Sequence, residues 1–298
     1  MNIIVVGSIN LDTNLKLPEL PEPGETLTAD QLQYTFGSKG ANQAVAAARL
    51  GNKVRMIGAV GNDDTGQQLV ANLQKAGVDT KGVKTSSKSS GAAFITIDQR
   101  GDKTIIVYPG ANSDVDEAWV KKHEMLIKQA DCMMLQLELP VETIVVAARM
   151  AYEHGVKVIL NPAPVKKFPK ELYKYCAVVT PNESELKCLT FGSDIEDGCA
   201  LLLRQGVSAV VVTLGSSGCF YKDQNNALHV TAFDVDPVDT TAAGDAFSAA
   251  LATKLGQDSP LKEALEFANA AGGLATNQLG AQTSLPTLRQ IKKFLKHH

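Results

Sequence analysis

The residue with the clearest chemical potential is Asp245, which follows the small dipeptide Ala243-Gly244 and precedes a run of small and apolar residues that predicts a helix. A helix N-terminus carries unpaired backbone N–H groups and partial positive charge, which attract an anion such as a phosphate. A carboxylate beside that anion could accept the proton of an attacking hydroxyl group. Aspartate is also a common helix-capping residue. The local sequence therefore leaves two roles open for Asp245, catalytic base and helix cap.

Polar residues also follow the first predicted strand, the apolar run 3–7. Asn10 and Asp12 are two positions apart, so on an extended chain their side chains point the same way. Ligands of α/β proteins bind at the carboxyl ends of the parallel strands. The pair is therefore a candidate for binding a ligand, with a simple Asx turn as the alternative.

A glycine-rich segment precedes the predicted helix 40–51. Lys39 and Asn42 are three positions apart and can share one helix face. This arrangement suits hydrogen bonding to a small polyol. The alternative is a loop whose lysine is merely solvated.

Two further segments follow predicted strands. The turn “GSSG” at 215–218 could cradle a nucleotide or could simply connect two elements. Asn182 and Glu185 could organise a hydrated Mg²⁺ or phosphate groups. They also fit the capping box of a helix that starts there.

The elements that position these residues alternate along the chain. Apolar runs at 3–7, 54–61, 131–138, 156–164, 177–182 and 209–215 predict strands, and helices are predicted at 40–51, 65–77, 141–154, 184–190 and 195–205. This alternation indicates a parallel sheet covered by helices on both faces. Segments 25–37 and 91–110 instead alternate with period two, the second around a hairpin signal at 99–102. They predict a small antiparallel sheet that covers a ligand cleft, a partner's equivalent sheet, or both.

The composition is that of an ordinary globular protein. The chain has 298 residues and a formal net charge of −3, which does not favour nucleic-acid or acidic-membrane partners. No apolar run reaches the roughly 18 residues that span a bilayer, and the first residues lack the basic region of a signal peptide. Five cysteines without a C-x-x-C pair indicate small buried side chains in a reducing cytoplasm. P-loop, protein-kinase and G-x-S-x-G motifs are absent.

Taken in order, the motifs resemble those of the ribokinase-like (PfkB-type) carbohydrate kinases from residue 3 to about 295. They include “GSINLD” (7–12), “FGSKGANQAVAAARLG” (36–51), “YPGAN” (108–112), “TPNESE” (180–185), “DTTAAGD” (239–245) and “GAQTS” (280–284). The resemblance implies one α/β kinase domain over 1–298, a three-layer αβα sandwich with a mostly parallel sheet. A discontinuous antiparallel β lid would come from about 13–37 and 90–110.

The resemblance also implies a reaction, the phosphorylation of D-ribose at its 5-hydroxyl by ATP, with Mg²⁺ and K⁺. Asp245 would be the base, beside an anion hole of Ala242, Ala243 and Gly244 N–H groups. The residues implied to bind sugar, besides Asp245, are Asn10, Asp12, Gly37, Ser38, Lys39, Asn42 and Glu138. Those implied to line the ATP site are Asn182, Thr213, Leu214, Gly215, Ser216, Ser217, Gly218, Gly244 and Asn269. Those implied to hold K⁺, partly through carbonyls, are Asp239, Thr241, Ala275, Gln278, Gly280 and Ser284, while Asn182 and Glu185 would lie near Mg²⁺.

One departure bears on the substrate. The family usually has two glycines before the lysine, and here Ser38 replaces the second. A kinase for 2-deoxyribose, another furanose or a nucleoside is therefore an alternative, as is a non-catalytic sugar- or nucleotide-binding regulator of the same fold. The exposed apolar face expected on the lid predicts a homodimer through paired lids.

Overall fold

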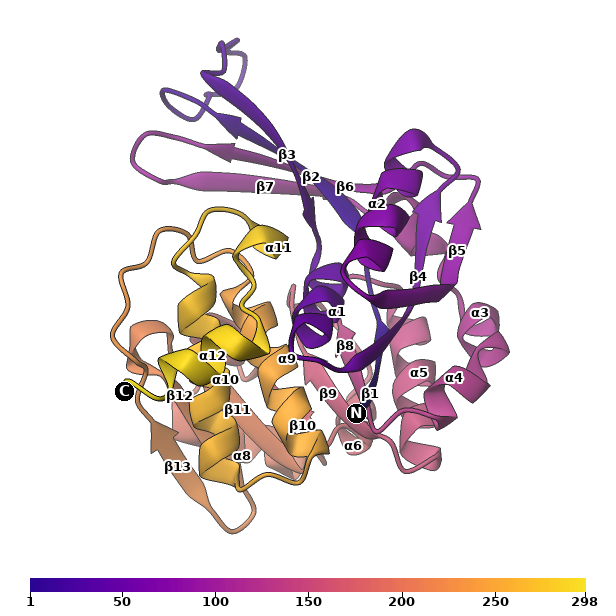
Figure 1. Cartoon of the computed structure of the whole chain (residues 1–298), viewed down its shortest axis with the longest axis vertical. Helices are drawn as coiled ribbons and strands as arrows, with labels where there is room; N and C mark the ends of the chain where they lie inside the picture. Colours follow the sequence, from indigo (N-terminus) through magenta and orange to yellow (C-terminus); the bar gives the residue numbers. More distant parts are fainter.

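A nine-stranded sheet forms the centre of the computed structural model, which describes residues 1–298 (Figure 1). Its strand order is β13-β12-β11-β10-β9-β8-β1-β4-β5. The strands are β1 (Asn2–Val6), β4 (Lys53–Gly61), β5 (Val78–Ser86), β8 (Cys132–Gln136), β9 (Lys157–Asn161), β10 (Val178–Val179), β11 (Ala209–Thr213), β12 (Cys219–Asp223) and β13 (Ala227–Val230). All neighbours from β5 to β11 pair in parallel, and only β12 and β13 are antiparallel. The predicted mostly parallel sheet is confirmed.

Helices cover both faces of this sheet because its strands are apolar on both sides. Ile3 and Val5 of β1 point into one core, and Ile4 and Val6 point into the other. The first core is completed by α1 (Lys39–Arg49), α2 (Asp64–Lys75), α9 (Ala243–Gly256), α10 (Leu261–Ala275) and α12 (Leu288–Phe294). The second is completed by α3 (Glu117–Lys122), α4 (Glu124–Lys128), α5 (Val141–Glu153), α6 (Leu172–Tyr175), α7 (Glu183–Leu189) and α8 (Ile195–Arg204). The result is the expected three-layer sandwich.

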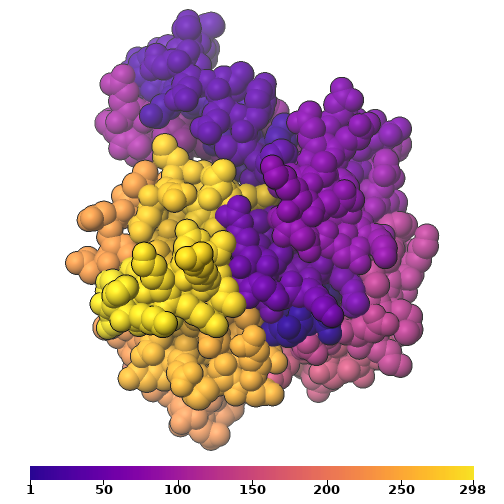
Figure 2. Space-filling view, in the orientation of Figure 1, coloured from indigo at the N-terminus to yellow at the C-terminus, as the bar shows by residue number.

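A second sheet, the lid, projects from one end of the body (Figures 1 and 2). Its order is β3-β2-β6-β7, from β2 (Asn10–Lys16), β3 (Gln31–Gly37), β6 (Gly91–Ile97) and β7 (Lys103–Tyr108). The predicted small lid is confirmed, but it is mixed rather than antiparallel throughout, because β2 and β6 pair in parallel while β2–β3 and β6–β7 are antiparallel. Both strands leave the same edge of the main sheet, β2 after β1 and β6 after β5, so they run in the same direction. Residues 25–30 also lie outside any strand.

The strands that the sequence did not predict lie mainly at sheet edges. β5 mixes buried and exposed residues, and β12 and β13 carry polar residues, so none of them is a continuous apolar run. The expectation of five buried cysteines is wrong at Cys188, which is exposed, while the other four are buried. No helix has the length and apolar character needed to cross a membrane.

Candidate active site

The candidate residues gather at the edge of the main sheet where the parallel strands end. Asn10 lies beyond β1, Glu138 beyond β8, Asn182 beyond β10 and Gly215 beyond β11. The lid grows out of this same edge (Figure 1). The carboxyl ends of parallel strands are the usual ligand-binding edge of α/β sheets, as the sequence predicted.

Asp245 occupies the third position of α9, and its side chain turns away from the helix end. Its carboxylate accepts hydrogen bonds from Asn42 Nδ2 and from Gln43 Nε2, each at 3.0 Å. The N-cap is Ala242, in the left-handed conformation with φ 63°, and it makes no side-chain cap. Asp245 is buried, whereas Gly244 beside it is exposed. The helix-cap interpretation of Asp245 is therefore wrong.

The N-terminus of α9 keeps backbone donors available. The N–H groups of Ala242 and Gly244 have no acceptor within the protein, while that of Ala243 reaches Thr240 O at 3.3 Å. A Cβ at Gly244 would meet no atom within 4 Å, so the space in front of this turn is open. Unpaired N–H groups at a helix N-terminus that face open space can bind an anion such as a phosphate group.

Five ionisable side chains, two aspartates, two glutamates and one lysine, define the electrostatics of the site. Burial raises the pKa of Asp245 to about 6, against the opposing effects of Lys39 and of the Asn42 and Gln43 hydrogen bonds. Burial, together with the Glu138 and Asp245 carboxylates, raises the pKa of Asp12 to about 7. Burial lowers the pKa of Lys39, but the carboxylates of Asp245, Glu138 and Glu185 outweigh this and raise it. Lys39 is half-buried among carboxylates, so the merely solvated lysine is excluded.

Two residues implied to bind sugar each carry a buried acceptor that has no partner within the protein. The two acceptors are Asp12 Oδ1 and Asn42 Oδ1. A buried polar atom without a hydrogen bond is costly, so native proteins leave few of them. The other oxygen of Asp12 packs against Gly37, where an added Cβ would stand 1.9 Å from Asp12 Oδ2. The site therefore presents acceptors that a ligand with hydroxyl donors would satisfy.

Ser38 lies in a backbone conformation that usually requires glycine, with φ 77° and ψ 149°. Its hydroxyl donates to Ser8 O at 2.7 Å and is thereby committed within the chain. The next N–H group, that of Lys39, donates to Glu138 Oε2 at 3.0 Å, and Ser8 Oγ also donates to this oxygen. The loop after β8 and the start of α1 are thus joined through Glu138.

Sequence reasoning did not single out Asn112, although it stands in the quoted “YPGAN” segment. Asn112 is buried in the 3-10 helix η1 (Gly110–Asp114), and its Nδ2 donates to Asn10 Oδ1 at 2.7 Å. Its Oδ1 accepts from the Ile9 N–H at 2.9 Å. Gly91 leaves room for this pair, since a Cβ there would stand 2.2 Å from both side chains. Asn112 therefore fixes the start of β2, which carries Asn10 and Asp12.

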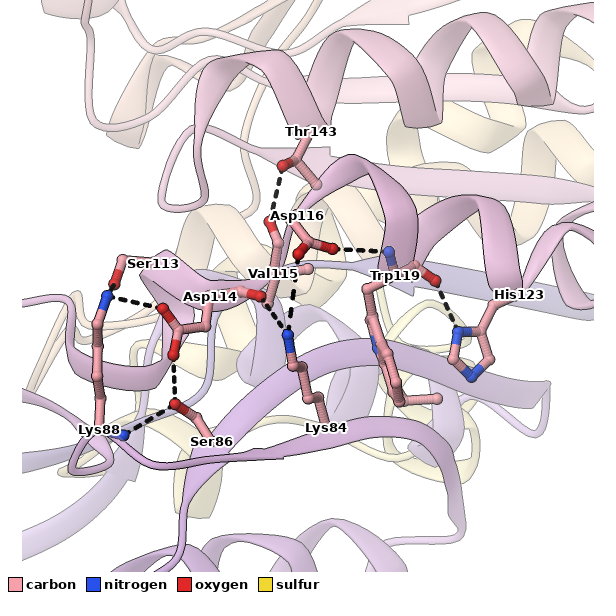
Figure 3. A network of polar contacts seen from close by, with 11 residues as sticks. Lys84, Ser86, Lys88, Ser113, Asp114, Val115, Asp116, Trp119, His123 and Thr143 are labelled. Carbon is pink, nitrogen blue, oxygen red and sulfur yellow. Dashed lines mark hydrogen bonds and ion pairs between the residues drawn. The ribbon is translucent and has the colours of Figure 1, made fainter.

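A polar network holds η1 in place between β5 and α5 (Figure 3). Lys88 Nζ approaches Asp114 Oδ1 at 2.7 Å, and Lys84 Nζ donates to Asp114 O at 3.0 Å. At the next turn Thr143 Oγ1 donates to Val115 O at 2.7 Å. These contacts lie outside the cluster around Asp245, and they support it by anchoring the helix that carries Asn112.

The residues implied to bind nucleotide lie farther along the same edge. Asn182 accepts from Glu185 N, and the Glu185 carboxylate accepts from Asn182 N, each at 2.8 Å. The capping-box interpretation is therefore confirmed at α7. A bridge joins Asn182 to Thr213, so the turn 213–218 begins beside this cap. Asn269 Nδ2 donates to Val230 O at 3.0 Å and to Thr231 O at 3.1 Å. The amide group of Asn269 thereby holds the end of β13.

The segments implied to bind K⁺ meet through Asp239. Its carboxylate accepts from Thr241 Oγ1 at 2.6 Å, from Thr241 N at 2.9 Å and from Gly280 N at 2.9 Å. Burial would raise its pKa, but these hydrogen bonds hold it below the ordinary value. The carbonyl of Ala275, at the end of α10, accepts no hydrogen bond although the residue is buried. A carboxylate, hydroxyl groups and a free carbonyl are suitable ligands for a hard monovalent cation. Gln278 is exposed, and Ser284 Oγ donates to Ala281 O at 3.0 Å.

Comparison with known proteins assigns the family. The sequence profile of the pfkB family carbohydrate kinases matches residues 1–288. The chain is 38% identical over 302 residues to the ribokinase of Haemophilus influenzae, covering 99% of this chain and 98% of that protein. It is 33% identical over 302 residues to the deoxyribokinase of Salmonella typhimurium, with 99% of each covered. The chain belongs to the pfkB family of carbohydrate kinases.

Solved structures agree with this assignment. The crystal structure of ribokinase from Thermotoga maritima matches with a TM-score of 0.93 at 37% identity, covering 99% of both chains. The structure of Arabidopsis thaliana ribokinase complexed with ribose and ATP matches with a TM-score of 0.93 at 31% identity, covering 99% of this chain and 98% of that one. The ribokinase-like fold and the carbohydrate-kinase class are thereby established.

Proposed function

We propose that this kinase transfers the γ-phosphoryl group of ATP to the 5-hydroxyl of D-ribose. The observation that carries the proposal is the pair of buried, unpartnered acceptors, Asp12 Oδ1 and Asn42 Oδ1, close to the Asp245 carboxylate. A bare sugar brings several hydroxyl donors to such acceptors. A nucleoside would need a large apolar surface for its base, and the residues that gather here are polar. The relatives named ribokinase support the same choice.

Asp245 would act as the base. Its carboxylate is held by Asn42 and Gln43 and lies next to the open N-terminus of α9. The sugar hydroxyl would give its proton to this carboxylate as its oxygen bonds to the γ-phosphorus and the bond to the ADP oxygen breaks. A carboxylate is a weak base for an alcohol, but phosphoryl transfer has a loose transition state and depends mainly on positioning and charge stabilisation. The Ala242 and Gly244 N–H groups would stabilise the phosphoryl charge.

Lys39 and the helix cap at Asn182 would lie near the phosphate groups of ATP. Lys39, held positive among carboxylates, is suited to pairing with a phosphate or sugar oxygen. Mg²⁺ would be bound chiefly by the nucleotide phosphates and water, as is usual for this ion, with Glu185 nearby. The turn 213–218 and Asn269 would line the nucleotide site, and bound Mg²⁺ would supply charge neutralisation.

The test is an ADP-release assay with Mg²⁺ and K⁺ present and D-ribose, 2-deoxy-D-ribose and adenosine as acceptors. We expect D-ribose to have the highest kcat/KM. Asp245→Asn should keep the fold by circular dichroism and lose about 10²–10⁴ in kcat. Near wild-type kcat in that variant would remove Asp245 as the base.

A second candidate is supported by the deoxyribokinase relative, which covers the whole chain. A higher kcat/KM for 2-deoxy-D-ribose than for D-ribose would replace ribose as the proposed substrate while leaving the kinase assignment intact. The assay therefore separates the two sugars directly.

A further inference from the structure

Three buried amide side chains connect Asp245 to the ends of the central strands. Gln43 Nε2, on α1, donates to Asp245 Oδ1 at 3.0 Å and to Asn161 Oδ1 at 3.4 Å. Gln43 Oε1 accepts from Gln136 Nε2, at the end of β8, at 2.5 Å. Asn161, at the end of β9, donates through Nδ2 to Thr180 O at 2.9 Å. Gln43 is 0% exposed and Gln136 is 1% exposed, so neither can contact a bound sugar directly.

The direction of each amide is fixed by its neighbours. An ionised carboxylate and a backbone carbonyl can only accept hydrogen bonds. Gln43 must therefore turn its NH₂ group to Asp245, which leaves its oxygen to accept from Gln136. Asn161 must turn its NH₂ group to Thr180, which leaves its oxygen to accept from Gln43. Both ends of the chain of amides thus impose one arrangement, and in it Gln43 uses both N–H groups and its carbonyl.

We infer that Gln43, supported by Gln136 and Asn161, is a positioning residue that fixes the direction of the Asp245 carboxylate for proton transfer. The inference rests on the role of Asp245 proposed above. Asn42 holds the second carboxylate oxygen from the same helix, so the two donors together remove the freedom of the carboxylate to rotate. A base that can rotate spends less time facing the reacting hydroxyl, which lowers kcat while sugar binding persists.

Gln43 also influences when Asp245 is ionised. The charged groups that face Asp245 are Lys39 on α1, Glu138 after β8 and Asp12 on β2. Lys39 and the amide donors favour the carboxylate form, while burial and the carboxylates of Glu138 and Asp12 oppose it. Loss of the Gln43 donor removes one of the favouring contacts, so the pKa of Asp245 should rise above about 6. The acid side of the rate profile then moves to higher pH.

The experiment compares Gln43→Met, which keeps the length and bulk of the side chain, with the wild-type kinase from pH 5 to pH 9. We expect kcat for D-ribose at pH 8 to fall about ten- to hundredfold, with KM within about twofold. We expect the acid limb of kcat to move up by about one pH unit. Gln43→Glu, which adds a carboxylate beside Asp245, should move it further.

Asn52→Ala is the matched control. Asn52 Nδ2 donates to Thr253 Oγ1 at 2.9 Å and so makes another buried contact between the α1 end and α9, away from Asp245. We expect a lower Tm for this variant and an unchanged acid limb. If Gln43→Met and Asn52→Ala both lose stability and neither moves the acid limb, Gln43 is merely structural and the inference is overturned.

Gln136→Leu covers the case in which Gln43→Met does not fold, because it removes only the contact that orients Gln43. It should shift the acid limb in the same direction by a smaller amount, and an unshifted profile would overturn the inference. A failure of the proposed function looks different. It would appear as no sugar phosphorylation by the wild-type kinase, or as full turnover by Asp245→Asn.

Discussion

Asp245 and Asn182 both lie at the N-terminal end of a helix, yet only Asn182 caps its helix. Asn182 is the N-cap of α7 and exchanges two hydrogen bonds with Glu185. Asp245 is three positions past its N-cap, and two amide donors on α1 take both of its oxygens. The difference follows from what lies next to each helix, a solvent-exposed turn in one case and the buried start of α1 in the other.

The ionisation of Asp245 and Asp12 predicts a pH dependence. Asp245 must be ionised to accept a proton, and its raised pKa is about 6. Asp12, with a pKa of about 7, interacts with it, so the measured values belong to the pair. We therefore expect kcat/KM to rise with pH through the range 6 to 7 and to level off above it. A profile of kcat/KM that stays flat down to pH 5 would contradict this assignment of the base.

Ser38 predicts a contrast between two substitutions. With φ 77°, glycine would relieve backbone strain at this position, while alanine would keep that strain, and both lose the bond to Ser8 O. The strain is worth about 1 kcal/mol, which is similar to the lost hydrogen bond. We expect Ser38→Gly to leave Tm nearly unchanged and Ser38→Ala to lower it.

The same two variants report on the sugar. Because the Ser38 hydroxyl is committed to Ser8, we expect Ser38→Gly to change the KM for D-ribose by less than about tenfold. A reversal of preference from 2-deoxy-D-ribose in the native enzyme to D-ribose in Ser38→Gly would instead make Ser38 a specificity switch, and D-ribose would not be the substrate.

Among the helices and strands, those with a continuous apolar or periodic pattern were predicted from the sequence. The inner strands β1, β4, β8, β9, β10 and β11 of the central sheet are mostly apolar, and each was predicted from its apolar run. Edge strands such as β5 mix buried and exposed residues and were not predicted. The prediction that the Asn10 and Asp12 side chains point the same way is confirmed, because alternate residues of a strand lie on one face. The bond from Gln43 to Asp245 joins residues 202 positions apart, and no local pattern specifies such a pairing.

The hydrogen bond from Gly280 N to Asp239 joins the two segments implied to bind K⁺, and from it we predict a cation effect. We expect kcat to rise with K⁺ and much less with Na⁺ at constant Mg²⁺, because the larger ion suits carbonyl ligands and orders the segment that leads into Ala242 and Gly244. Asp239→Asn should reduce this response, since an amide cannot accept from both Thr241 and Gly280 through two oxygens. Equal rates with and without K⁺ would remove the potassium site and leave the kinase assignment standing.

At the scale of the whole molecule, the register of the lid separates two faces. In a sheet, residues directly opposite one another point to the same side. Tyr34 lies opposite Thr13, Thr13 opposite Phe94, and Phe94 opposite Ile106. The neighbouring row contains Asp12 and therefore faces the sugar site. The row with Tyr34, Phe94 and Ile106 faces away from it, and Ile106 is 69% exposed.

An apolar sheet face left in water predicts a partner, and the simplest is a second copy of this lid. We expect the native kinase to have about twice the 31.7 kDa chain mass by sedimentation or light scattering. Ile106→Glu should give the mass of one chain, because it places a charge on the outer face. Ile105→Glu is the matched control, since Ile105 is next in sequence, 52% exposed and on the opposite face. It should leave the mass at two chains. A monomeric native kinase would exclude the paired lids, and dissociation by Ile105→Glu alone would place the contact on the face that carries Asp12.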